Sequence, residues 1–249
     1  MISEWVAKPL LLLAFTQLLS PATPLSAQTP TAAEILERSI DYHDPERLWG
    51  RFKGTLTVVA EYPERQPRVS TIAMDQPGDT FRIIMVQDGV EKALSLQQGV
   101  CSLSFQGSET FSAAIAEKER LTCERAQMWR DYYSYLYGLP MKLQDPGTIL
   151  SPVVQEVDFH GKRALVLEVR YDPETGSDLW YFYLDPETYA LQAYQFYHDK
   201  AANDGEYILL EGEIQAGTIR IPQNRSWFTN REGRFLGKDL LRKATLMDE

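Results

Sequence analysis

The stretch FKGTLTVVAEY, residues 52–62, alternates apolar and polar side chains along its length. Successive side chains of a β-strand point to opposite faces, so this period of two predicts a long strand with one apolar face. A single strand cannot bury that face, and it must pair with others in a sheet. The neighbouring sequence therefore decides which kind of sheet it joins.

Shorter apolar runs follow this stretch, separated by hairpin-sized breaks such as Pro-Gly at 77–78 and Asp-Gly at 88–89. Later in the chain, two Asp-Pro-Glu-Thr turns at 172–175 and 185–188 divide further runs, because proline presets the turn. A succession of hairpins predicts an antiparallel meander. We expect strands at 52–62, 69–74, 81–86, 90–96, 100–105, 153–159, 163–171, 179–184, 189–198, 206–215 and 218–228, with a loose end from about Arg242.

Two segments have a helical pattern instead. A Thr-x-x-Glu capping box at 31–34 begins an apolar-faced segment that Asp-Pro ends, which predicts a helix near 31–43. A second helical segment, aromatic in its second half, is expected near 112–137. The fold class is therefore α+β, a strongly curved antiparallel sheet or half-barrel of about ten strands with helices packed against its concave face. We expect a single domain over residues 28–249.

Residues 1–27 have the features of a secretory signal peptide. A positive charge at Lys8 precedes a short apolar run, and Ser26-Ala27 offers a small-residue cleavage site. A buried N-terminal helix or an uncleaved anchor is the alternative. We expect an exported protein, periplasmic or secreted. No cysteine follows the cleavage site, so we expect no lipid anchor and no transmembrane span in the mature chain.

The sequence holds two cysteines, Cys101 and Cys123, both in the part expected to be exported. An even count in an exported chain predicts a disulfide, and two buried thiols are the alternative. Their separation excludes a Cys-x-x-Cys redox pair, and no pair of histidines lies nearby to complete a zinc site.

Charge and motifs exclude several function classes. The formal net charge of −10 opposes binding to a phosphate backbone, so we expect no nucleic-acid partner. The sequence has no Gly-x-Ser-x-Gly, His-Glu-x-x-His or glycine-rich phosphate loop, and it indicates no cofactor or metal. The acidic turn at 172–178 lacks the glutamate that ends an EF-hand loop, so we interpret it as a turn.

Two histidines each precede an aspartate, in Tyr42-His43-Asp44 and Tyr197-His198-Asp199. A histidine beside an aspartate can act as a base or a metal ligand. Neighbours in a strand point to opposite faces, however, and both tripeptides fall at element ends, so a structural role is preferred.

Aromatic side chains fall on both faces of the strands near the centre of the expected sheet. A sheet with one wet face should alternate apolar and polar residues, so the second face needs a cover. That cover is either the packed helices or a bound hydrophobic ligand in a closed cavity under the aromatic helix. The candidate lining residues are Trp180, Phe182, Tyr194, Phe196, Tyr133 and Tyr137.

Several motifs resemble a family of exported bacterial-envelope proteins known as domain of unknown function 6503. They are YHDP at 42–45, YYSYLYGLPMKL at 132–143 with DPGTI at 145–149, WYFY at 180–183 and GEYILL at 205–210. The resemblance spans nearly the whole mature chain and implies no activity or catalytic residues. The meander with helices on one face is similar, more loosely, to the half-barrel of the LolA and LolB lipoprotein carriers, an analogy of architecture only.

These observations favour a non-catalytic envelope protein that binds a lipid or another hydrophobic group. The alternative is an envelope interaction module whose aromatic surface meets a protein partner. A third hypothesis is an unrecognised hydrolase or metal-dependent enzyme built around His43 or His198.

Overall fold

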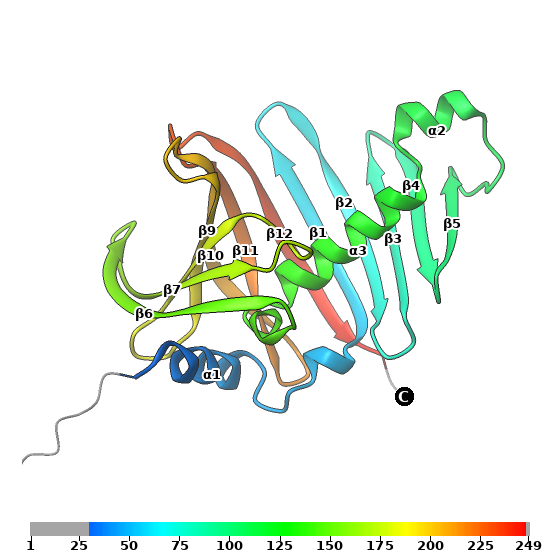
Figure 1. The fold of residues 1–249 in the computed structure, drawn as a ribbon. Coiled ribbons are helices and arrows are strands. Elements are labelled where there is room, and N and C mark those ends of the chain that lie inside the picture. Colours follow the sequence, from blue (N-terminus) through cyan, green and yellow to red (C-terminus); the bar gives the residue numbers. More distant parts are fainter. Residues whose placement is uncertain (1–29, 248–249) are drawn as a thin grey trace, which may run out of the picture.

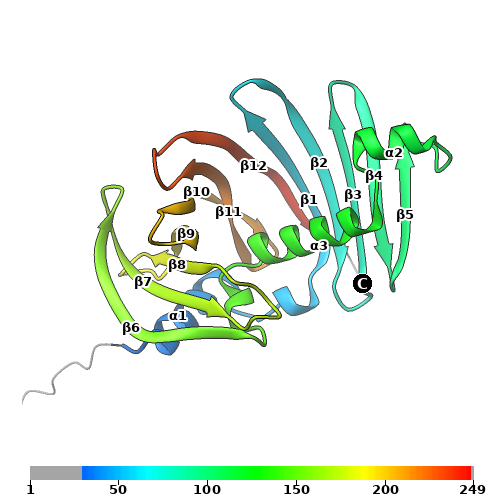
Figure 2. The same ribbon diagram turned by 45° about the horizontal axis from the view of Figure 1, so that its top comes forward.

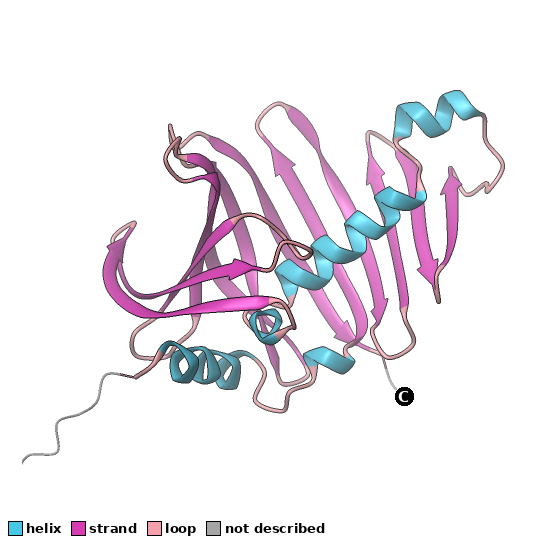
Figure 3. Ribbon diagram, viewed as in Figure 1, coloured by secondary structure: helices cyan, strands magenta, loops and turns pink. Residues whose placement is uncertain are grey.

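A computed structural model describes residues 30–247. The signal peptide expected over residues 1–27 lies outside the described residues. The strands are β1 Lys53–Tyr62, β2 Arg65–Asp75, β3 Thr80–Gln87, β4 Val90–Gln97, β5 Val100–Phe105, β6 Thr148–Phe159, β7 Lys162–Tyr171, β8 Leu179–Leu184, β9 Leu191–Asp199, β10 Asp204–Ala216, β11 Ile219–Thr229 and β12 Phe235–Leu246. The helices are α1 Ala32–His43, α2 Ala113–Glu119 and α3 Cys123–Tyr137, with short 3₁₀ turns η1 Trp49–Arg51 and η2 Met141–Gln144 (Figure 3).

All strands belong to one open antiparallel sheet in the order β5-β4-β3-β2-β1-β12-β11-β10-β9-β8-β7-β6. Strands β5 and β6 follow one another in sequence yet form the two opposite edges of the sheet. The segment between them carries α3 across the concave face, from the β4 side toward β7 (Figure 1). The turned view shows β6 and β7 curling back toward α1 and the end of α3 (Figure 2). The curved sheet with helices on its concave side therefore agrees with the expected fold class.

The expected count of about ten strands is wrong, because the sheet has twelve. The missed strand is β12, which joins the two halves of the sheet by pairing with both β1 and β11. Thr57 pairs with Lys243 and Val58 with Leu241, so Arg242 is an extra residue in β12. Such a bulge shifts the alternation by one residue and hides the period of two. The chain from Lys243 to Leu246 is consequently paired with β1 rather than loose.

The helical segment expected near 112–137 is two helices. Ser112 caps α2, which ends at Arg120 in a left-handed conformation with φ of 54°. Thr122 then begins α3 by accepting the backbone N–H of Arg125 at 3.2 Å. α2 buries no residue, whereas α3 buries Ala126, Trp129, Tyr133, Leu136 and Tyr137. α3 therefore supplies the fully buried side chains of this pair, and α2 packs against the main core only through the partly buried Ile115 and Ala116.

The main core lies between the concave face and the helices α1 and α3. At the end of α3 the backbone passes very close to Trp49. A Cβ on Gly138 would lie 2.1 Å from the Trp49 indole nitrogen and 2.5 Å from the Ser134 carbonyl oxygen. A side chain does not fit there, which explains the glycine that ends the aromatic helix.

Candidate functional site

A groove runs along α3, between the helix and the concave face of the sheet. It consists of two adjoining hollows that are open to solvent and share Met128, Tyr132 and Trp227. The hollow beside the C-terminal half of α3 has a volume of ≈ 790 Å³, and the one beside the N-terminal half has ≈ 320 Å³. We refer to the two together as the α3 groove.

Aromatic side chains from both the sheet and the helix line the α3 groove. Trp180 on β8 stacks on Phe196 on β9 with ring centroids 4.8 Å apart. Tyr135 of α3 meets the Trp180 ring edge-on at 5.7 Å, and Tyr132 lies parallel to Trp227 of β11 at 6.4 Å. These side chains are only partly buried, so the groove presents aromatic surface to solvent.

The six residues predicted to line a cavity separate into two groups. Trp180 and Phe196 line the α3 groove. The other four, Tyr133, Tyr137, Phe182 and Tyr194, are at most 1% exposed and pack in the core behind it. The rings of Tyr133 and Tyr137 lie 5.5 Å apart, and those of Phe182 and Tyr194 lie 6.3 Å apart. The hollow itself is open along its side, whereas the sequence predicted a closed cavity.

A buried arginine fixes the C-terminal end of α3 to the sheet. Arg225 on β11 is 1% exposed and donates to the carbonyl oxygens of Leu136 at 3.2 Å and Pro222 at 2.8 Å. Its guanidinium lies 3.9 Å from the centre of the Tyr137 ring. Because the last carbonyl groups of a helix lack partners within it, this donor satisfies one of them and holds the helix in place.

Asp239 on β12 lies opposite Arg225 in the strand register. It provides a second attachment of α3 to the sheet. It accepts a hydrogen bond from the Tyr132 hydroxyl at 3.1 Å. Burial raises the pKa of Asp239 above its usual range, although Arg225 and Arg68 act against this. Burial likewise raises the pKa of Tyr133 to about 12, so this phenol is neutral at physiological pH.

The sequence reasoning missed Tyr132, Trp227 and the arginine–aspartate pair of β11 and β12. Arg225 and Trp227 lie two residues apart and so share one face of a strand, which is a signal the sequence contains. In an alternating strand, however, an arginine at such a position is expected to lie on the solvent-exposed face. Its burial depends on α3 lying across that face.

His43 has a structural position. It is fully buried, and its Nδ1 lies 2.7 Å from the carbonyl oxygen of Arg220 while its Nε2 accepts the backbone N–H of Leu191 at 2.9 Å. Burial lowers the pKa of this imidazole. Asp44 accepts the backbone N–H groups of Leu48 and Trp49 at 2.8 and 2.7 Å. Both side chains of the motif therefore tie α1 to its neighbours.

His198 lies on the surface and pairs with an aspartate other than its neighbour in sequence. Its Nδ1 is 2.7 Å from an oxygen of Asp178, and this hydrogen bond raises the pKa of the imidazole. The pair belongs to the rim of the sheet, and Asp178 also lines the α3 groove. Within residues 30–247, no group of three or more potential metal ligands occurs.

The acidic turn at 172–178 has its own hydrogen bonds. Asp172 accepts the backbone N–H of Thr175 at 2.9 Å, as expected of a turn-forming aspartate. Among the described residues, no helix is long and apolar enough to cross a membrane.

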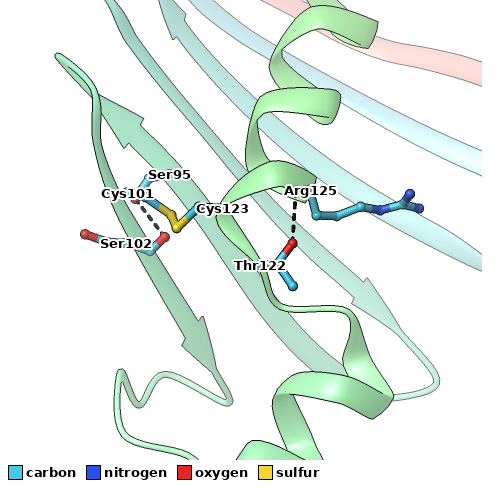
Figure 4. Close-up of a disulfide and its surroundings, with 6 residues drawn as sticks. All are labelled: Ser95, Cys101, Ser102, Thr122, Cys123 and Arg125. Atoms are coloured by element: carbon cyan, nitrogen blue, oxygen red, sulfur yellow. Dashed lines mark hydrogen bonds between the residues drawn. A yellow bond between two sulfur atoms is a disulfide. The ribbon is translucent and has the colours of Figure 1, made fainter.

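The predicted disulfide is confirmed. Cys101 on β5 is joined to Cys123, the first residue of α3, with Cα atoms 5.8 Å apart. Figure 4 shows the bond linking the edge strand to the first turn of the helix, next to the Thr122 cap. The helix is thus attached to the sheet covalently at one end and through Arg225 at the other.

The opposite, convex face of the sheet carries a smaller apolar cluster of Ala164, Val166, Tyr183 and Ala193. Phe159 stacks on Tyr183 with ring centroids 3.8 Å apart. Small alanines leave room for these rings, so both faces of the β7–β9 region are apolar, as the sequence indicated.

Comparison with known proteins identifies the family. The family model described as Family of unknown function (DUF6503) matches residues 8–242, which confirms the resemblance drawn from the sequence. No curated protein matches the chain at a significant level.

The chain is similar to several solved structures at low sequence identity. A LolA superfamily protein from Nitrosomonas europaea has 10% identity and a TM-score of 0.49, covering 89% of this chain and 96% of that one. An outer membrane lipoprotein-sorting protein domain from Vibrio parahaemolyticus has 13% identity and a TM-score of 0.49, covering 88% and 95%. A DUF1329 family protein from Desulfovibrio piger has 11% identity and a TM-score of 0.49, covering 88% and 94%. Similarities with such low identities and TM-scores indicate nothing about the activity of this protein.

Proposed function

The chain belongs to the family of unknown function DUF6503, whose description supplies no activity, and we propose from its geometry that it binds a hydrophobic group in the α3 groove. The observation that carries the proposal is an open groove walled by aromatic rings from two sides. Small-molecule sites are concave and mostly apolar, with a few polar groups that fix orientation. The α3 groove has this character, and its length along the helix suits an elongated ligand such as an acyl chain.

The groove rests on a packed support. Behind Trp180 and Phe196 lie the buried rings of Phe182 and Tyr194, so the wall is held in one arrangement. A wall of this kind loses little freedom when a ligand binds, which favours affinity. The role we propose is therefore that of a non-catalytic binder, carrier-like in the sense that it shields an apolar group from water.

We further propose that the protein acts outside the cytoplasm. The disulfide between Cys101 and Cys123 requires an oxidising compartment to persist. Residues 1–27 have the composition of a signal peptide. N-terminal sequencing of the protein from its native host should then give Gln28 as the first residue, and an intact Met1 in exported material would contradict cleavage.

The test of ligand binding uses two variants of the same strand. Trp180→Ala removes a groove ring, and Tyr181→Ala removes its neighbour on the opposite face. We expect the Trp180→Ala variant to bind a fluorescent fatty-acid probe about tenfold more weakly, a cost of about 1.4 kcal/mol, and the Tyr181→Ala variant to bind normally. The urea midpoint of each variant is measured in parallel. Absence of probe binding by the delipidated wild type would refute the proposal.

The convex face supports a second candidate, an interaction with a protein partner. Tyr207 and Phe228 stack there with ring centroids 5.0 Å apart, and Phe235 beside them is 41% exposed. Exposed aromatic surface is a common feature of protein interfaces. Native mass spectrometry of gently purified protein separates the two candidates, since retained lipid supports the groove and a retained polypeptide supports the convex face.

A further inference from the structure

A basic pocket lies at the start of α3, where the helix meets β2 and β4. Its volume is ≈ 240 Å³, and four arginines and two lysines line it against a single carboxylate, Glu119. Both lysines are already paired with that carboxylate, Lys92 at 3.3 Å and Lys118 at 3.8 Å. One carboxylate offsets only one of the two lysines, so most of the positive charge of the pocket comes from its arginines.

These four arginines, Arg65, Arg68, Arg120 and Arg125, form no salt bridge, although the buried Asp239 carboxylate acts on Arg68 at longer range. Within the part of the chain that the structure describes, no carboxylate lies within 4.0 Å of their side-chain nitrogens. The chain has 35 acidic and 25 basic residues, so carboxylates are abundant elsewhere. A cluster of unpaired positive charge in an acidic protein is costly unless an anion binds there, because like charges repel.

One aromatic ring contacts two of these charges. The guanidinium groups of Arg68 and Arg125 lie 4.7 Å and 5.2 Å from the centre of the Trp129 ring. Trp129 is 9% exposed, so the platform is fixed in the core. The pKa of Arg125 is lowered by its partial burial and by the charges of Arg120 and Arg68. The buried carboxylate of Asp239 partly offsets the charge of Arg68, whereas Arg120 and Arg125 form no salt bridge within residues 30–247.

The position of Arg125 is set by the first turn of α3. Its backbone N–H donates to the Thr122 cap, and its side chain reaches Met128 Sδ at 3.1 Å. Figure 4 shows Arg125 pointing away from the Cys101–Cys123 bond, toward the neighbouring strands of the sheet.

The basic pocket adjoins the α3 groove and shares three lining residues with it. Arg68, Arg125 and Trp129 line both the basic pocket and the adjoining hollow beside the N-terminal half of α3. An apolar groove with a cluster of arginines beside it matches a molecule with an apolar chain and an anionic end. Arginine suits this task because its planar donors match the oxygens of a phosphate group.

We propose that the basic pocket binds a phosphate head group of an amphiphile whose apolar chain lies in the α3 groove. This proposal rests on the proposed function, and it adds the class of ligand. The groove binds the apolar chain of the amphiphile, and the arginines determine which head group is preferred.

The test compares three probes by isothermal titration calorimetry, below the micellar concentration of each amphiphile. They are dodecyl phosphate, dodecyl maltoside and inorganic phosphate. We expect wild type to bind dodecyl phosphate about tenfold more tightly than the maltoside, with a preference that falls as salt screens the charges. The exposed Arg120→Gln, a residue of the basic pocket that does not line the α3 groove, should remove much of this preference while leaving maltoside binding unchanged. Arg125→Gln, which lies between pocket and groove, should also remove much of the preference. Arg234→Gln makes the same change of charge on an exposed turn away from the pocket and should have no effect.

The outcomes separate this inference from the proposed function. Equal binding of both amphiphiles, unaffected by the arginine variants, would overturn the head-group site and leave the groove intact. Binding of inorganic phosphate as tightly as dodecyl phosphate would assign the pocket to a free anion and overturn the amphiphile. Failure of every amphiphile to bind would refute the proposed function itself. Far-UV circular dichroism of the variants checks that each is folded.

Discussion

At the scale of single residues, His43 couples stability to pH. It bonds to backbone groups of Arg220 and Leu191 through both ring nitrogens, one as donor and one as acceptor, which requires the neutral ring. Burial lowers its pKa below the usual 6.5. The unfolded chain therefore binds a proton below about pH 6.5 that the folded protein does not, and the contribution of His43 to stability is present above that pH and lost as pH falls. His198 acts in the opposite sense, because Asp178 raises its pKa.

We predict that His43→Gln lowers the free energy of unfolding by about 2–3 kcal/mol at pH 8, because buried backbone groups lose their partner. The difference from wild type should shrink toward pH 5, where wild type has lost the His43 contribution. Urea unfolding at several pH values measures this. His198→Asn is the control, and its difference from wild type should instead be larger at low pH. A His43→Gln difference that stays constant with pH would contradict the assignment.

Residue by residue, the sequence predicts which face a side chain occupies better than how deeply it is buried. The period of two correctly groups Trp180 with Phe182 and Tyr194 with Phe196 on the concave face. It cannot say that Phe182 is covered while Trp180 borders a groove, because that depends on where α3 ends above them. Arg225 shows the same limit, since a polar residue in an alternating strand is expected to face water.

At the scale of elements, the disulfide holds the first turn of α3 against β5. It closes a loop with a sequence separation of 22 residues. A cross-link of this span stabilises mainly by restricting the unfolded chain, by about 3 kcal/mol.

We predict that the double variant Cys101→Ser, Cys123→Ser lowers the free energy of unfolding by about 3 kcal/mol. Urea unfolding followed by circular dichroism measures it, and reduced wild type should behave like the variant. Ser102→Ala, beside Cys101 on β5, is the matched control and should change stability little (Figure 4). Equal midpoints for oxidised wild type and the double variant would show that the cross-link contributes nothing.

The elements that sequence reasoning misjudged lack the usual local signals. α2 and α3 are separated at Arg120, which adopts a left-handed conformation where glycine is the common choice. β12 contains a bulge at Arg242 that breaks its alternation. The hairpin strands were predictable because their turns carry glycine and proline at the required positions.

At the scale of the whole molecule, two connections join the halves of the sheet. β12 pairs with β1 in one half and with β11 in the other. α3 is bonded to β5 through Cys123 and to β11 through the Leu136 carbonyl oxygen. Because one core cluster runs beneath both connections, neither half has a separate interior of its own. The sequence predicts one domain, and this arrangement makes the prediction testable.

We predict that the two halves unfold together. Leu241 on β12 is fully buried, and Leu241→Ala should lower the free energy of unfolding by about 2–5 kcal/mol. Hydrogen exchange measured by mass spectrometry at increasing urea should show the same loss of protection in peptides from 53–105 and from 148–229, because the strand that joins them is weakened. Lys243→Ala, an exposed position on the same strand, should leave protection in both halves unchanged. If Leu241→Ala accelerates exchange in only one half, the sheet consists of two units that open independently, and a ligand lying along α3 would then bridge two domains rather than sit on one.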